Sequence, residues 1–110
     1  MKKAVSGLRA WMVQRFTALY LLAFFLFSLL HFAFAPPDSY QSWRTWVTAP
    51  AVLNATALFF ILLLLHAWVG LRDVAMDYAR SLPLRVTLLA TLALVLTGLG
   101  MWALQILLSA

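Results

Sequence analysis

The sequence has no cysteine and few charged residues. Of its 110 residues only 10% are charged, and three are acidic, whereas 65% are hydrophobic. The lack of cysteine excludes disulfides, thiolate metal sites and a cysteine nucleophile, so any metal must be held by histidine or carboxylate. Neither a glycine-rich phosphate loop nor a nucleophile motif is present, and no internal repeat is evident. A soluble-type active site is therefore not expected.

Apolar residues are far more abundant here than the roughly 45–50% found in soluble domains. They gather in three runs, 16–35, 51–71 and 86–108. Each run is close to the ~20 residues that cross a ~30 Å hydrocarbon core as a helix. Backbone in lipid must satisfy its own hydrogen bonds, and the runs lack the alternation of a membrane barrel. We predict an all-α membrane protein, a single domain over residues 1–110, with three transmembrane helices.

The basic residues predict how the chain crosses the membrane. Seven of the eight precede the first run or separate the second from the third, namely Lys2, Lys3, Arg9, Arg15, Arg72, Arg80 and Arg85. Cytoplasmic flanks favour such residues, so we expect a cytoplasmic N-terminus and a periplasmic C-terminus. The net charge of +5 is spread beside the apolar runs rather than gathered in one patch, which argues against a nucleic-acid partner.

The start of the chain also resembles a secretory signal. Met-Lys-Lys precedes an apolar stretch, and Ala33-Phe34-Ala35 fits a small-x-small cleavage site. Pro36 after the cut and the long basic region before the run argue against cleavage. Without a transit-like extension, we expect a multi-pass protein of a bacterial inner membrane.

Two histidines fall within the predicted spans, where ionisable side chains are costly and usually face a partner or cofactor. His66 is expected about 9 Å in from Arg72, and His31 near the opposite surface, so the two cannot ligate one metal. For His31 an interfacial role is favoured. For His66 two alternatives stay open: a structural hydrogen bond between helices, or axial ligation of haem iron through a neutral imidazole.

Two further features follow His66 along the chain. Gly70, one turn later, leaves room for a porphyrin edge or a neighbouring helix. The phenol of Tyr78 can donate to a quinone carbonyl, and the adjacent Asp77 can help to relay protons. The simpler alternative makes Tyr78 an interfacial aromatic residue and pairs Asp77 with Arg80.

Arg15 opens the first run at the same predicted membrane face as His66 and Tyr78. Its default role is to set topology, but a guanidinium there can also bind a haem propionate in bidentate fashion. Basic, imidazole and phenol groups at one face fit redox chemistry coupled to a soluble partner on that side.

These residues resemble the small hydrophobic membrane anchor, of cytochrome b type, of bacterial succinate dehydrogenase. The resemblance rests on His66-Ala67-Trp68-Val69-Gly70, then Asp77-Tyr78 and Leu84-Arg85, and on Arg15-Phe16-Thr17-Ala18, which matches the Arg-x-Thr-Ala opening of that family's first helix. It covers most of the chain, although the first loop and last run match only in character.

The resemblance implies a respiratory complex with a flavoprotein, an iron–sulfur subunit and two membrane anchors that reduce ubiquinone. On that basis His66 is one axial ligand of a haem b shared with the second anchor, the cytochrome b subunit. Tyr78 binds the quinone head group with Asp77 beside it, Arg15 approaches a haem propionate, and Gly70 packs near the haem. The chain itself catalyses no succinate oxidation.

Other functions stay open at this point. A fumarate reductase anchor would run the reaction in reverse, and menaquinone in anaerobic cells would favour it. A holin or a small transporter would be a non-redox alternative. A proton-coupled transporter of this size would need a carboxylate at membrane depth, but all three acidic residues lie in predicted loops or near helix ends.

Overall fold

The computed structural model describes residues 2–109, which form four helices and no strand. The helices are α1 (Lys2–Phe34), α2 (Tyr40–Val47), α3 (Pro50–Tyr78) and α4 (Leu82–Ser109). Gly7–Phe34 of α1, together with the whole of α3 and of α4, are long and apolar enough to cross a membrane. The prediction of an all-helical chain with three spans is thus confirmed.

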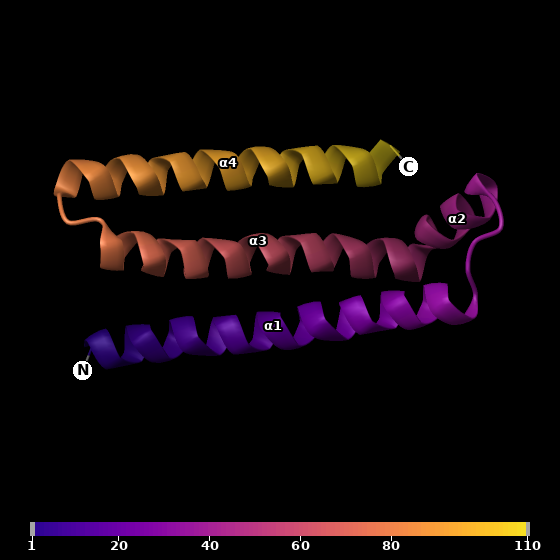
Figure 1. The fold of residues 1–110 in the computed structure, drawn as a ribbon, viewed down its shortest axis with the longest axis horizontal. Helices are drawn as coiled ribbons and strands as arrows, with labels where there is room; N and C mark the ends of the chain where they lie inside the picture. Colours follow the sequence, from indigo (N-terminus) through magenta and orange to yellow (C-terminus); the bar gives the residue numbers. More distant parts are fainter. Residues whose placement is uncertain (1, 110) are drawn as a thin grey trace.

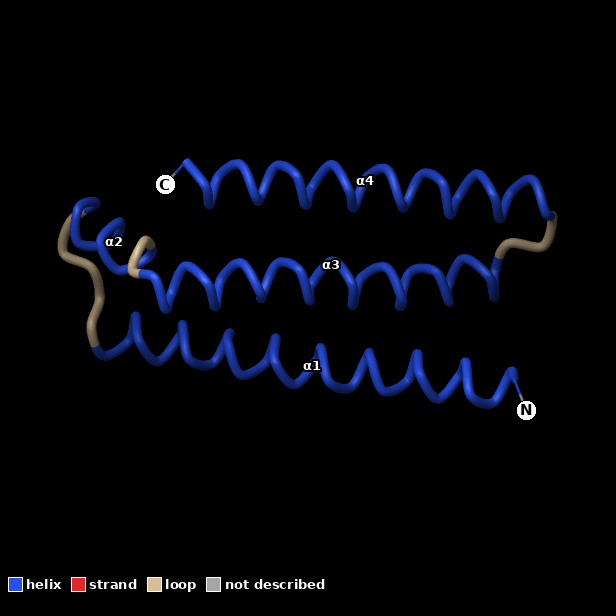
Figure 2. Tube along the Cα trace, turned by 180° about the vertical axis from the view of Figure 1, so that it is seen from behind, coloured by secondary structure: helices blue, strands red, loops and turns tan. Residues whose placement is uncertain are grey.

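The three long helices lie antiparallel in a flat row with α3 in the middle (Figure 1). Within the described residues α3 packs against both α1 and α4, whereas α1 and α4 do not contact each other. The bundle measures 53 × 26 × 20 Å. The N-terminus and the α3–α4 turn lie at one end, and α2 lies with the C-terminus at the other (Figure 2). The middle helix therefore carries residues that face either neighbour.

Two helices extend well beyond their apolar runs. The first begins at Lys2 rather than near residue 16, although the side chains of Lys2 and Lys3 lie outside the described part. Helix α3 continues past Leu71 to Tyr78, because no glycine or proline interrupts that stretch. It ends where Ala79 turns to an extended conformation, with φ −81° and ψ 114°. Asp77 and Tyr78 thus occupy the last helical turn rather than a loop.

The segment between the first two spans, expected as a loop, contains the short helix α2. Its N-cap is Ser39, whose hydroxyl oxygen accepts from the backbone N–H of Ser42 at 3.1 Å. Such a cap satisfies one of the unpaired donors of the first turn and favours helix formation. Hydropathy searches miss this helix because it is amphipathic and too short to span a bilayer.

The α3–α4 turn is held by two side chains. Ser81 caps α4 through its hydroxyl, which lies 3.4 Å from the backbone nitrogen of Leu84. Arg85 folds back and donates from Nε to the carbonyl oxygen of Ala79 at 2.7 Å. Ala79 is only 2% exposed. The turn therefore fixes the end of α3, and with it the backbone that carries Asp77 and Tyr78.

Candidate functional site between the first and middle spans

His66 faces α1 and forms a hydrogen bond across the helix interface. Its Nδ1 lies 2.9 Å from the Thr17 hydroxyl oxygen. Thr17 is 4% exposed, and it is the one buried polar residue among those whose side chains the structure describes. The imidazole is half-buried, and its Nε2 has no hydrogen-bond partner within residues 7–109. One ring nitrogen thus contacts the neighbouring helix, and the other has no hydrogen-bond partner among the described residues.

Gly70 lies one turn after His66 and is in contact with Gln14 of α1. A Cβ added at Gly70 would stand 3.1 Å from the Gln14 amide nitrogen. The missing side chain therefore makes room for a residue of the neighbouring helix, which is one of the two alternatives that the sequence left open. The side-chain carbonyl oxygen of Gln14 is buried and has no hydrogen-bond partner among the described residues.

Two further contacts fix the register of α1 against α3. The Tyr20 hydroxyl donates to the carbonyl oxygen of Ala55 at 2.7 Å. One turn further along α1, the rings of Phe24 and Phe59 stack with centroids 4.7 Å apart. Hydrogen bonds between membrane helices are worth about 0.6 kcal/mol on average, so several contacts together are needed to set a register.

A groove of about 450 Å³ lies along α1 beside the Thr17–His66 pair. It is lined by Arg9, Met12, Val13, Phe16, Thr17 and Leu65. Its α1 residues recur at helical spacing and so share one face of that helix. The surface that lines the groove is almost entirely apolar. Such a groove suits an apolar ligand.

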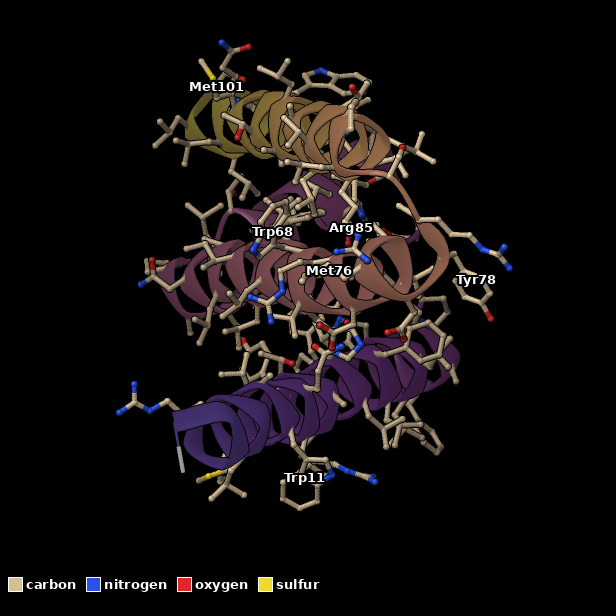
Figure 3. All side chains as sticks on the ribbon, turned by 90° about the vertical axis from the view of Figure 1, so that its left-hand side faces the viewer. Trp11, Trp68, Met76, Tyr78, Arg85 and Met101 are labelled. Atoms are coloured by element: carbon tan, nitrogen blue, oxygen red, sulfur yellow. The ribbon has the colours of Figure 1, made fainter. Side chains whose placement is uncertain are left out.

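Arg15 lies on a different side of α1. Positions two residues apart differ by about 200° around a helix, so Arg15 points away from the side that carries Thr17. Its guanidinium lies over the ring of Trp11, 5.3 Å from the centroid. Trp11 projects from α1 on the side turned away from α3 (Figure 3). Within this chain the structure does not bring Arg15 together with His66.

Tyr78 and Asp77 lie apart from the Thr17–His66 pair, in the last turn of α3. The ring of Tyr78 is 80% exposed and projects away from the bundle (Figure 3). Asp77 is also exposed, and it makes no ion pair in the part of the chain with described side chains, where Arg72 and Asp73 pair at 3.5 Å. The alternative of an Asp77–Arg80 pair is therefore not formed. Tyr78 lies twelve residues from His66, about 18 Å along the helix.

His31 belongs to an aromatic cluster at the other end of the bundle. Its ring stacks on Trp46, with centroids 4.4 Å apart and an angle of 12° between the planes. Phe27 and Phe32 pack against the same Trp46 ring. Fourteen residues separate His31 from Thr17, about 21 Å along α1. The interfacial role favoured for His31 stays a prediction.

The described residues contain no group of three or more histidine, cysteine, aspartate or glutamate side chains that could hold a metal ion. A metal bound through His66 alone must receive its other ligands from elsewhere, as haem iron does from its porphyrin.

Sequence reasoning missed Thr17, Gln14 and Arg9 as residues of the site. A usable signal was the matching depth of Thr17, two residues after Arg15, and His66, six residues before Arg72. Arg9 and Gln14 carry no comparable signal, because only the packing of the helices decides which of their neighbours lie close.

Known proteins of similar sequence bear on this geometry. A model of the "Succinate dehydrogenase/Fumarate reductase transmembrane subunit" family matches residues 1–107. The chain is also 31% identical, over 101 residues, to the "Succinate dehydrogenase hydrophobic membrane anchor subunit" of Coxiella burnetii (strain RSA 493 / Nine Mile phase I). That match covers 92% of this chain and 88% of the relative.

Proposed function

The chain belongs to the family of succinate dehydrogenase/fumarate reductase transmembrane subunits, and from this premise we propose that it binds haem b and forms a quinone site together with a second anchor subunit. As a multi-pass anchor it holds the catalytic part of the complex, a flavoprotein and an iron–sulfur subunit, at the membrane. A holin or transporter function is set aside, because the match spans nearly the whole chain.

The observation that carries the haem assignment is the state of His66. Its Nδ1 is engaged by Thr17 while Nε2 has no partner within residues 7–109, which is how haem-ligating histidines are held. Thr17, the partner of His66, also lines an apolar groove that includes Arg9, although His66 itself is not among its lining residues. A haem b bound there would supply a one-electron redox centre inside the bilayer. The second axial ligand would come from the other anchor.

The propionate role implied for Arg15 stays a prediction. Since its guanidinium lies against Trp11, a propionate bound by Arg15 must approach α1 from the side away from Thr17. Arg9 offers a second guanidinium, on the side of α1 that carries Thr17. Gly70 contributes by letting α1 and α3 pack closely beside the proposed haem site.

We place the quinone at the end of α3. The exposed Tyr78 hydroxyl can donate to a quinone carbonyl, and the unpaired Asp77 carboxylate lies beside it to accept or pass on a proton. An exposed phenol on one chain forms only one wall of a binding site. The other walls would come from the iron–sulfur subunit and the second anchor.

The charge distribution supports a cytoplasmic N-terminus in a bacterial inner membrane. Arg9, Arg15, Arg80 and Arg85 all belong to the end of the bundle that holds the N-terminus and the α3–α4 turn (Figure 1). Cytoplasmic flanks favour basic residues. That end also carries Tyr78, so the quinone site would face the soluble subunits.

An optical spectrum of the purified complex tests the haem assignment. We expect a six-coordinate, low-spin b-type haem in the native complex and its loss in His66→Ala. The matched control is His31→Ala, which removes the other histidine about 21 Å along α1 from Thr17 and should leave the spectrum unchanged. An unaltered low-spin spectrum in His66→Ala would overturn the ligand assignment.

Quinone kinetics test Tyr78. Tyr78→Phe should retain haem but slow quinone reduction, because the ring stays and only the donor is lost. Tyr40→Phe, which removes an exposed phenol at the opposite end, is the control. Normal kinetics in Tyr78→Phe would return this residue to a purely interfacial role.

The direction of the reaction is a separate matter, because the family includes both succinate dehydrogenases and fumarate reductases. We favour succinate oxidation, following the name of the Coxiella burnetii relative. Ubiquinone as the electron acceptor is what the resemblance of the sequence implies. Extraction of the quinone from the purified complex decides the point. Menaquinone in complex from anaerobic cells would favour fumarate reduction.

A further inference from the structure

We propose that Thr17 is a positioning residue for His66, fixing the imidazole as its Nδ1–H tautomer so that the Nε2 lone pair is available to a metal. This inference rests on the proposed haem-binding function. Nothing in the sequence patterns assigned Thr17 a role, and the assignment comes from the hydrogen bonds that its hydroxyl makes.

The direction of the Thr17–His66 hydrogen bond follows from the Thr17 surroundings. A hydroxyl has one hydrogen to donate and two lone pairs to accept with. The Thr17 oxygen lies 2.6 Å from the carbonyl oxygen of Val13 and 3.1 Å from that of Gln14. Carbonyl oxygens only accept, and the contact to Val13 is the shortest of the three, so we assign the Thr17 hydrogen to the Val13 carbonyl. With its hydrogen used there, the Thr17 oxygen acts as an acceptor toward His66.

The tautomer of His66 follows directly. To bond an acceptor at 2.9 Å, Nδ1 must carry a hydrogen. In a neutral imidazole the other nitrogen then holds the lone pair that binds a metal. Histidine ligands commonly donate their second N–H to such an acceptor, which fixes the ring and makes the ligand more basic. The Thr17 oxygen is an acceptor of this kind, so it can both fix the ring and make the imidazole more basic.

Burial makes the contact durable. Thr17 is 4% exposed, so neither water nor lipid headgroups can replace His66 at its oxygen. In a low-dielectric interior, leaving this N–H without a partner would be costly. The neighbouring Tyr20–Ala55 hydrogen bond and the Phe24–Phe59 stack keep α1 in register, and therefore keep Thr17 opposite His66.

The first test reads the tautomer without any haem. The full chain, labelled with 15N-histidine and reconstituted in bilayers, should give a protonated Nδ1 and an unprotonated Nε2 for His66. The His31→Gln background leaves this ring as the single source of signal. Thr17→Ser retains the hydroxyl and should preserve the pattern, whereas Thr17→Val, of similar shape, should lose it. Identical patterns in Thr17→Val and the parent would overturn the proposal.

The second test uses the assembled complex. With Thr17→Val we expect haem to dissociate about 10- to 100-fold faster to an external acceptor, the usual cost of removing such a supporting contact. The midpoint potential should rise, because an imidazole without its acceptor donates less charge to iron. Thr17→Ser should match the native complex in both the haem dissociation rate and the midpoint potential. A native dissociation rate and potential in Thr17→Val would contradict the positioning role.

The two proposals fail in different ways. If His66→Ala keeps its low-spin haem, the ligand assignment itself is wrong. If His66→Ala loses haem while Thr17→Val behaves as native in both tests, His66 is a ligand but Thr17 does not position it.

Discussion

The two faces of the middle helix are built differently. Toward α1 it presents His66 to a hydroxyl, a backbone carbonyl of Ala55 to Tyr20, and Gly70 to the amide of Gln14. Toward α4, no side-chain hydrogen bond joins the two helices within residues 7–109. Gly100 instead lies against Leu64, beside largely apolar grooves of about 550 and 300 Å³.

The difference separates two ways of joining helices in lipid. Apolar packing alone is enough for association, because close approach at small residues yields good van der Waals contact. Polar groups in the bilayer are costly and are usually kept for function. We therefore assign the proposed haem site to the α1–α3 face, and bundle assembly mainly to the α3–α4 face.

Overpacking the apolar face should have the largest effect on stability. A Cβ at Gly100 would lie 2.8 Å from Leu64 Cδ1. The flexible end of Leu64 can move aside for the single methyl of Gly100→Ala. The larger side chain of Gly100→Leu should overpack the interface and destabilise the chain by about 1–3 kcal/mol. Denaturation with SDS in mixed micelles, followed by helicity, measures this. Gly98→Leu is the control, since nothing lies within 4 Å of a Cβ there. Equal effects at the two glycines would mean that Gly100 is not a packing point.

Removing a structural hydrogen bond from the polar face should have a smaller effect. Tyr20→Phe deletes the donor to Ala55 and should lower the free energy of unfolding by about 0.6 kcal/mol, the average for such bonds. The same SDS titration applies. Tyr40→Phe, at an exposed phenol of α2, should change nothing. A loss well above 2 kcal/mol would show that the polar face, rather than the apolar one, dominates assembly.

The smallest effect is expected at the contact between Gly70 and Gln14. A Cβ at Gly70 crowds the amide by only a few tenths of an ångström. In a double-mutant cycle, the effect of Gly70→Ala on the free energy of unfolding should be about 0.5 kcal/mol more stabilising in a Gln14→Ala background than in the native chain. This value is the lower end of the coupling energies between touching residues. Equal effects in both backgrounds would mean that this glycine makes no room for Gln14.

The spans were predictable because their cause is local. A run such as 86–108 is predominantly apolar and uncharged, and lipid requires its backbone to satisfy its own hydrogen bonds, which a helix does. Helix ends were less predictable. α3 reaches Tyr78 because nothing interrupts its backbone after Leu71, although the apolar run stops there. The short helix α2 begins at the Ser39 cap rather than in an apolar run.

The site was predictable only in part. His66 was identified because an ionisable ring at membrane depth needs a partner. The identity of that partner depends on the register and the rotation of α1 relative to α3. Both helices are apolar on most sides, so hydropathy does not distinguish one register from another. For that reason Thr17 was missed. Arg15 was grouped with His66 by its predicted depth and by the family resemblance, whereas in the structure it lies against Trp11 on another side of α1.

The flat order of the row also bears on how the protein is made. Synthesis runs from the N-terminus, so α1 and α3 leave the ribosome before α4 does. Thr17 and His66 both belong to this early pair, and α1 has no contact with α4 in the described chain. A two-span hairpin can thus bring the imidazole to its hydroxyl before the last helix enters the bilayer.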